Sequence, residues 1–328
     1  MAFHARSIAR LLLTLACAAL GGQGVSPQAY PERPIRMVVP YPPGGQFDIH
    51  ARLLGDKLKD ILGQPIVIEN RPGAATMIGA EAVARSPNDG YTLLFAGANM
   101  FAILPQIYRK VPYKVSDFQP ISLVSDLPMG LTISSKQMPV ANLKEFVTYV
   151  QARPGAINFG TSGTGGLQYL IGELANLRIG LKMVQVSYRG TPEVLTGLLS
   201  DQVPLAFDGM TAYLPNAGPG KPLKILAVSS DRRVEAAPDV PTFAELGYPE
   251  MTGSTRGGVV VPADTPRAIV NKLHDAIVRA NNDPQVRAAV IAGAAIPRTS
   301  TPEEFAAVIK SDSALWGEII QRLNIKLD

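Results

Sequence analysis

Residues 35–68 have the sequence IRMVVPYPPGGQFDIHARLLGDKLKDILGQPIVI, and this stretch decides the fold class. Two short apolar runs flank a segment in which apolar residues recur at helical spacing until Gly63 ends it. The same alternation continues to residue 96. It predicts strands over 35–39, 66–68 and 92–96 and helices over 48–62 and 78–85. This order favours an α/β fold in which a mostly parallel sheet has flanking helices.

The alternation returns further along the chain, which has 328 residues and therefore room for two domains. The patterns predict helices over 143–152, 167–177 and 192–199 and strands over 157–159, 183–186, 203–207, 223–228 and 259–261. Helices follow over 266–281 and 284–292, and a capping box with the sequence TPEE at 301–304 opens a last amphipathic helix. We therefore expect two α/β lobes.

Two extended segments, 125–133 and 253–261, lie where one lobe should pass the chain to the other. They predict two hinge crossings and a discontinuous first lobe. Lobe I would comprise residues 30–126 plus 254–328, and lobe II would comprise residues 127–253.

The N-terminus is typical of an export signal. Arg6 and Arg10 precede a continuous apolar run over 11–20, which is far shorter than the roughly 20 residues of a membrane span. We expect a signal peptide over residues 1–29. A lipoprotein signal ending at Cys17 is the alternative, although Thr14 stands where such signals usually have leucine.

Composition then excludes several classes of protein. Hydrophobic residues make up 46% of the chain and charged residues 18%, which suits a chain with a sizeable core. The net charge of +4 falls to +2 without the signal and is scattered, so no nucleic-acid partner is expected. Removing the signal also removes Cys17, the only cysteine, which excludes disulfides and thiolate chemistry. These features are compatible with the bacterial periplasm.

Histidine chemistry is also sparse. Beyond the signal the chain has only His50 and His274, which are far apart in sequence and begin no HExxH pattern. Catalytic zinc sites and Ser-His-Asp triads both need a histidine in a specific partnership. We expect structural or surface roles for both, and therefore no catalytic residue, no metal and no cofactor.

A glycine-rich turn follows the strand predicted at 157–159 and has the sequence GTSGTGG over 160–166. Thr164 rules out a nucleophile elbow, Gly166 replaces the lysine of a P-loop, and Gln168 replaces the last glycine of a dinucleotide fingerprint. Such a turn before a helix either lets backbone N–H groups approach an anion or is only a tight connection.

The segment Pro42–Asp48 occupies the same place in lobe I. Asp48 either caps its helix or shapes the loop so that the amides of Gly44 to Phe47 face a ligand. Because ligands of open α/β sheets bind at the carboxyl ends of strands, the two loops would face each other across a cleft.

Several longer stretches resemble one known family. They are YPERPIRMVVPYPPGGQFDIHARLLGDKL at 30–58, NFGTSGTGG at 158–166, VSYRGTPEVLTGLLSDQVPLAFD at 186–208, APDVPTFAELG at 237–247 and TPEEFAAVIKSD at 301–312. Together they resemble the Bug family, the TctC-like periplasmic solute receptors of tripartite tricarboxylate transporters. The resemblance implies a two-lobed periplasmic-binding-protein fold that closes over a small carboxylate, held largely by backbone amides and ordered water.

The resemblance also implies the position of the site. Carried over by position, the ligand-binding residues would be Gly44, Gly45, Gln46, Phe47, Asp48, Asn99, Met100, Thr161, Ser162, Gly163, Thr164, Gly165, Gln168, Tyr188, Gly190, Thr191 and Asp208. The chain departs from the family at Gln46-Phe47, Met100-Phe101 and Arg256-Gly257, so the identity of the carboxylate does not carry over. We add Arg256 as a candidate that either reads a second anionic group or lies in solvent.

The expected function is therefore capture of a small carboxylate by a periplasmic monomer, for transporter subunits in the membrane or for a sensor kinase. An exported hydrolase or isomerase on the same scaffold is the alternative, with Asp48 or Asp208 as its base. A ligand-responsive regulatory domain is a third class, and the export signal and the absence of a DNA-binding module argue against it.

Overall fold

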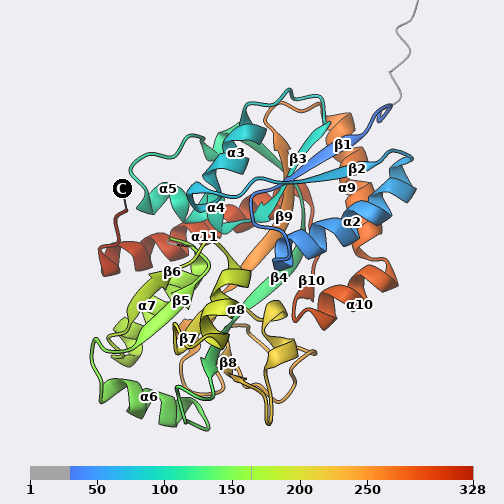
Figure 1. Ribbon diagram of the computed structural model, residues 1–328. Helices are drawn as coiled ribbons and strands as arrows, with labels where there is room; N and C mark the ends of the chain where they lie inside the picture. The colour runs from blue at the N-terminus through green and yellow to red at the C-terminus, as the bar shows by residue number, and fades with distance from the viewer. Residues whose placement is uncertain (1–29, 164, 328) are drawn as a thin grey trace, which may run out of the picture. The chain divides into compact units, whose positions relative to one another are not determined.

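The computed structural model describes residues 30–163 and 165–327 (Figure 1). The predicted signal peptide over 1–29 and the predicted binding residue Thr164 lie outside the described residues. The strands are β1 Ile35–Val39, β2 Ile66–Asn70, β3 Thr92–Gly97, β4 Phe118–Ser134, β5 Asn158–Thr161, β6 Val184–Ser187, β7 Leu205–Gly209, β8 Leu223–Val228, β9 Ser254–Pro262 and β10 Ile296–Pro297. The helices are α2 Gln46–Leu62, α3 Met77–Ala84, α4 Asn99–Ala102, α5 Leu104–Ile107, α6 Leu143–Gln151, α7 Leu167–Ile179, α8 Thr191–Leu199, α9 Arg267–Asn281, α10 Pro284–Ala292 and α11 Pro302–Leu323.

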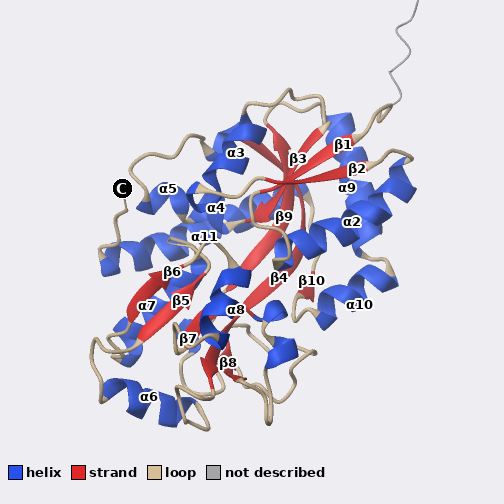
Figure 2. Ribbon diagram, viewed as in Figure 1, coloured by secondary structure: helices blue, strands red, loops and turns tan. Residues whose placement is uncertain are grey.

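These strands are hydrogen-bonded in the order β2-β1-β3-β9-β4-β7-β5-β6, and β8 and β10 also pair with β4 (Figure 2). β1 lies parallel to β2 and β3, and β5 lies parallel to β6 and β7. Every residue of β3 is buried, which explains its continuous apolar sequence. The predicted α/β class with parallel strands and flanking helices is confirmed.

The long strand β4 connects the two groups of parallel strands. From Phe118 to Pro128 it pairs with β9, and from Met129 to Ser134 it pairs with β7 and β8. β4 and β9 contain nearly all of the two segments predicted to be extended. The change of partners between Pro128 and Met129 falls close to the predicted passage from lobe I to lobe II, whose boundaries stay a prediction.

Most helix ends follow local sequence signals. Gly63 ends α2 in the left-handed conformation, with φ of 71°, which glycine adopts without steric cost. The side chain of Thr301 accepts a hydrogen bond from the amide of Glu304 in a complete capping box, as predicted. α2 begins at Gln46, two residues before the predicted start.

The short helices α4 and α5 were not predicted. Each has only four residues, and a proline stands in the first turn of α5, so no helical period develops in the sequence. They pack against the amphipathic helix α11, which also contacts β4. Among the described residues no helix is long and apolar enough to span a membrane, and no cluster of three or more potential metal ligands occurs.

Candidate functional site

Three helices at the predicted site begin at glycines. Gly45, Gly166 and Gly190 are the N-caps of α2, α7 and α8, and no described residue caps any of the three helices with its side chain. In contrast, Asn142 and Asp283 cap α6 and α10 with their side chains. Backbone N–H groups in an uncapped first turn keep their hydrogen-bonding capacity, and the helix dipole favours an anion there. Helices α3 and α9 also lack side-chain caps. A missing cap therefore indicates a binding site only where, as described next, the loops before such helices also lie close together.

Tertiary contacts bring the loops of the two predicted lobes together. A Cβ atom on Gly190 would lie 2.9 Å from the ring of Pro42, so the loops before α8 and α2 touch. Thr211, just after β7, donates a hydrogen bond to Oε1 of Gln46 at 3.1 Å. A Cβ atom on Gly166 would lie 4.0 Å from Nδ2 of Asn99 in α4, which is van der Waals contact. Segments far apart in the sequence therefore meet where the strands end.

Asp48 organises the loop before α2 without capping the helix. Its carboxylate accepts hydrogen bonds from the amide of Gly44 and from Nδ2 of Asn70, both at 2.9 Å, and forms a salt bridge with Arg52 at 2.8 Å. Burial alone would raise the pKa of Asp48, but the hydrogen bonds from Arg52, Gly44 and Asn70 outweigh it and lower that pKa. These contacts agree with the expectation that Asp48 shapes the loop.

Asp208 organises the second side of the site in the same way. This fully buried carboxylate accepts hydrogen bonds from Ser162 at 3.0 Å, from the amide of Gly209 at 2.8 Å and from Tyr213 at 3.0 Å, and Thr191 also bonds to it. Burial raises the pKa of Asp208, and these donors oppose the rise. Asp208 thus ties the loop after β5 to the first turn of α8.

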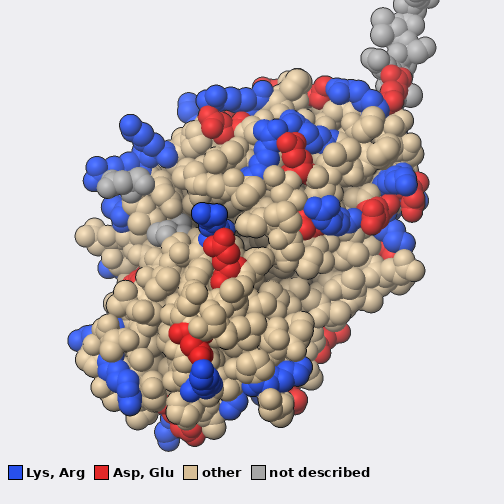
Figure 3. Space-filling model, viewed as in Figure 1, with Lys and Arg blue, Asp and Glu red and all other residues tan. Residues whose placement is uncertain are grey.

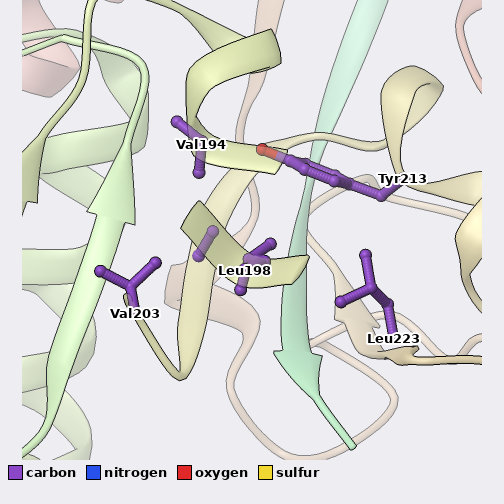
Figure 4. Packing of buried hydrophobic residues seen from close by; sticks show 6 residues of the cluster. Val194, Leu198, Val203, Tyr213 and Leu223 are labelled. Atoms are coloured by element: carbon purple, nitrogen blue, oxygen red, sulfur yellow. The ribbon is translucent and has the colours of Figure 1, made fainter. Parts of the chain in front are cut away.

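A hydrophobic cluster holds Tyr213 in position for this bond. The ring of Tyr213 packs with Val194 and Leu198 of α8 and with Leu223 of β8 (Figure 4). Its hydroxyl bonds to Asp208 at 3.0 Å. Tyr213 is fully buried, so the hydroxyl needs this partner. Sequence reasoning did not identify Tyr213.

The loop after β5 is held by its own side chains. The hydroxyl of Thr161 donates to the carbonyl of Gly163 at 2.9 Å, and Gln185 donates to the same hydroxyl at 2.7 Å. Gln168 donates to Ser162 at 3.1 Å. Gly163 has φ of +115°, which only glycine adopts easily. These contacts hold Thr161, Ser162 and Gly163 in place.

Gly165, with φ of +86°, packs closely against α5 and the C-terminal segment. A Cβ there would lie 2.4 Å from Ile107 of α5, 3.0 Å from Tyr108 and 3.2 Å from Leu327. Glycine at this position permits the loop to approach α5 and the C-terminal segment.

Three predicted site residues direct their side chains into packed regions. The ring of Phe47 is buried and stacks on Tyr41 with ring centroids 4.3 Å apart. Met100 is fully buried, and the ring of Tyr188 packs over Gly160 and Gly197. The side chains of Phe47 and Met100 are therefore occupied by packing, whereas Tyr188 is half-buried.

Two buried oxygen atoms near Gly97 have no hydrogen-bond partner among the described residues. They are Oδ1 of Asn99 and Oγ1 of Thr255. Both side chains crowd the Cβ position of Gly97, at 2.2 Å for Oδ1 and 2.7 Å for the Thr255 methyl group. Asn99 was predicted, whereas Thr255 was missed because a lone threonine in a strand carries no sequence signal.

Arg256 does not lie with the glycine-rich loops. In β9 its neighbours Thr255 and Gly257 lie near Gly97 and Phe47, whereas its guanidinium forms an ion pair with Asp312 of α11. Successive side chains of a strand point to opposite faces, which separates Arg256 from the loops. In the structure the guanidinium of Arg256 is thus ion-paired and partly exposed, and its part in binding stays a prediction.

His50 is a buried structural residue. Its Nε2 lies 3.2 Å from Oδ1 of Asn281, its Nδ1 lies 3.2 Å from the hydroxyl of Ser125, and its ring meets Phe95 edge to face. Burial lowers the pKa of His50 from 6.5 to about 4, although the Asn281 contact opposes this shift. The expected structural role agrees with these contacts.

We predict that His50 makes the protein acid-sensitive. Because the unfolded chain binds the proton more tightly, the free energy of unfolding should fall as the pH drops from 6.5 toward 4. The loss should reach about 3 kcal/mol at pH 4. Urea denaturation at pH 7 and pH 4 should show that His50→Gln removes this share of the pH dependence. An equal pH dependence in both proteins would contradict the assignment.

Charged side chains give no strong field on the face seen in Figure 3. Lysine, arginine and acidic residues are scattered over it, with wide areas of other residues between them. The contacts that join the loops involve the uncharged residues Pro42, Gln46, Asn99, Gly166, Gly190 and Thr211.

Comparison with known proteins gives consistent matches. The model of the tripartite tricarboxylate transporter family receptor matches residues 50–325. Protein BugT of Bordetella pertussis is 36% identical over 305 residues, which cover 92% of this chain and 93% of that protein.

Two solved structures extend the match to the fold. The structure of the periplasmic binding protein BugD has a TM-score of 0.83 and 31% identity, and the match covers 90% of this chain and 99% of BugD. MatC from Rhodopseudomonas palustris, with bound malate, has a TM-score of 0.82 and 29% identity, covering 89% of this chain and all of MatC. The two-lobed α/β fold of binding proteins is thereby confirmed.

Proposed function

Because this chain belongs to the family of tripartite tricarboxylate transporter receptors, we propose that it captures a small organic carboxylate between two lobes in the periplasm. The relative MatC was solved with malate, which supports a dicarboxylate as the class to test first. Lobe I would comprise residues 30–126 plus 254–328 and lobe II residues 127–253. The change of β4 pairing partners between Pro128 and Met129 supports that division.

One observation carries the proposal. The loops before α2 and α8 meet at the Pro42–Gly190 contact, and Asp208 joins Ser162, in the loop before α7, to Thr191 at the start of α8. Such an arrangement offers several backbone N–H groups to one carboxylate and needs no cationic side chain. Each helix end contributes about 0.3–1 kcal/mol, and the hydrogen bonds add to this. Binding of a carboxylate by uncharged backbone N–H groups is consistent with a chain whose charged residues are scattered.

The same contacts weigh against the enzyme alternative. A general base needs a lone pair available to the proton that it removes. Both oxygens of Asp48 and of Asp208 already accept hydrogen bonds, and Asp208 is fully buried. The two carboxylates act as supports for the loops in this proposal, and a receptor role follows from the family.

Native mass spectrometry of the purified protein tests the proposal, because a tight complex survives purification. We expect the folded protein to carry a bound acid that denaturation releases. Retention of a compound without an acidic group, or chemical turnover of the released acid by the protein, would contradict a carboxylate receptor. Co-purification with the ligand-bound protein would then identify its partner subunits in the membrane.

We further predict that ligand closes the two lobes. The loop contacts between Pro42 and Gly190 and between Gln46 and Thr211 cross the proposed lobe boundary, and bound ligand should hold them closed more of the time. Small-angle X-ray scattering with saturating ligand should therefore give a smaller radius of gyration than the free protein. An unchanged radius, with binding shown by calorimetry, would mean that the crossings are not a hinge.

A further inference from the structure

A short segment directly after β7 reaches two elements of the proposed lobe I. Thr211 lies in a helical turn over Met210–Ala212 and is half-buried. Its hydroxyl lies within hydrogen-bond distance of two acceptors, which are Oε1 of Gln46 at 3.1 Å and the carbonyl oxygen of Gly293. Gln46 begins α2, and Gly293 is the C-cap of α10. Because Thr211 belongs to the proposed lobe II, its hydroxyl joins the two lobes.

The surfaces around this hydroxyl fit closely. A Cβ atom on Gly209 would lie 2.3 Å from Nε2 of Gln46, so the Gln46 amide lies directly on the end of β7. A Cβ atom on Gly293 would lie 3.2 Å from the methyl group of Thr211. Next to Gly293, Ala294 belongs to a hydrophobic cluster whose other buried members come from the proposed lobe II. They are Met210, Ile225, Val228 and Val234.

Hydrogen bonds hold Thr211 in place on its own side of the contact. The amide of Tyr213 donates to the carbonyl of Met210 at 2.9 Å, which closes the turn around Thr211. The hydroxyl of Tyr213 donates to Asp208, and Asp208 also accepts the amide of Gly209. The same carboxylate supports the loop after β5, so that loop and the turn of Thr211 share one support.

The contact of Thr211 with Gln46 and Gly293 lies beside a narrow groove of about 30 Å³. These three residues line the groove together with residues of α2 and α10, two helices that contact each other on one side of the molecule (Figure 1). None of its described lining residues belongs to the loops before α7 and α8. Thr211 can therefore act on the lobes without touching a carboxylate held by those loops.

This contact stabilises only the arrangement in which the lobes lie together. A hydroxyl has one proton, which the two acceptors share, so the closed form gains about one hydrogen bond. In an open form water would solvate the same three groups. Valine at position 211 would leave both acceptors against a methyl group in the closed form and would change the open form little. The ratio of closed to open molecules should therefore fall.

We propose that Thr211 is a positioning residue for lobe closure, which raises the affinity for a carboxylate that it does not touch. The inference rests on the closure of two lobes proposed above. A ligand that binds the closed form has an apparent dissociation constant that rises as the closed fraction falls. Because the contact forms only after the lobes have met, its loss should speed ligand release more than it slows ligand association.

Distances between the lobes in solution test this proposal. Cys17 is the only cysteine and lies in the predicted signal peptide, so Lys59→Cys in α2 and Arg178→Cys in α7 introduce two exposed positions for spin labels. Double electron–electron resonance then gives the closed and open fractions at malate concentrations from zero upward. Thr211→Val removes the hydroxyl, and Thr211→Ser keeps it. Thr148→Val is the matched control, because that hydroxyl bonds within α6.

Thr211→Val should lower the ratio of closed to open molecules about threefold to tenfold, as expected for one hydrogen bond. Thr211→Ser and Thr148→Val should follow the parent. Gly209→Ala is the second variant, since its φ of −61° suits alanine and the added methyl group displaces the Gln46 amide. It should lower the same ratio.

The proposal is overturned if folded Thr211→Val and Gly209→Ala proteins follow the parent at every malate concentration, or if Thr211→Ser loses as much as Thr211→Val. A single distance in all proteins also overturns it, because no equilibrium then exists for the contact to shift. Weaker malate binding by Thr211→Val with an unchanged closed fraction would instead place Thr211 in the ligand site. A parent that ignores malate would count against the proposed dicarboxylate, while the unliganded proteins still decide the role of Thr211.

Discussion

Gly45→Val is expected to abolish the thermal stabilisation that a bound carboxylate gives, while the unliganded protein melts as the parent does. Gly45 is the N-cap of α2, with φ of −76° and ψ of 162°, a conformation that any residue adopts. A Cβ there meets only the carbonyl of Pro42 at 3.6 Å, which is an ordinary contact. The added side chain therefore costs the fold little and occupies the space in front of the amides of α2.

The expected size of the effect follows from linkage. A ligand at 100 times its dissociation constant stabilises the folded state by about 2.7 kcal/mol. At roughly 2–4 °C per kcal/mol, the melting temperature of the parent should rise by about 5–10 °C. Thermal denaturation with malate, citrate, glutamate and nicotinate screens the ligand classes. Gly45→Ala, with its smaller side chain, should retain part of the shift that Gly45→Val loses.

Gly163 offers no equally clean variant on the second loop. Its φ of +115° means that any side chain strains the backbone, so lost binding would not be separated from a disturbed loop. A full thermal shift in Gly45→Val would contradict the loop site directly.

Asp208→Ala should cause the largest loss of stability, about 3–5 kcal/mol. Alanine leaves the buried donors Ser162, Tyr213 and the amide of Gly209 without their acceptor. Urea denaturation at pH 7 measures the loss. The matched control is Tyr213→Phe, which removes one donor and should cost about 1 kcal/mol.

The two variants also separate stability from binding. Where Asp208→Ala still folds, its carboxylate affinity should fall, because Ser162 and Thr191 lose the group that connects the loop after β5 to α8. Tyr213→Phe should bind nearly as the parent does. A cost below about 1 kcal/mol for Asp208→Ala would show that the buried network contributes little.

The sequence predicted the elements that have strong local signals. Strand β1 and the end of α2 at Gly63 lie where the apolar runs and the glycine placed them, and the capping box at Thr301 forms as expected. Each signal is local, since a few neighbouring residues determine the backbone conformation. Elements without a period, such as α4 and α5, depend on packing against α11 and were missed.

The candidate site was predictable only in part, for a similar reason. The roles of the glycines and of Asp48 could be predicted because they depend on neighbouring residues of the same loop. The contacts of Asp48 with Gly44 and Asn70 agree with the predicted role in shaping the loop. The partners Tyr213 and Thr255 reach the site through tertiary contacts that no spacing records. The pairing of Arg256 with Asp312 likewise joins residues from β9 and α11, which sequence reasoning had no means to connect.

A crystal structure of the protein with a bound dicarboxylate tests the central claim most directly. The account predicts one carboxylate between the lobes, with its oxygens about 2.7–3.2 Å from backbone N–H groups at the starts of α2 and of α7 or α8. It also predicts the contact between Pro42 and Gly190 in that closed form. A dicarboxylate bound elsewhere, or held chiefly by arginine or lysine side chains while these N–H groups face water, would contradict it.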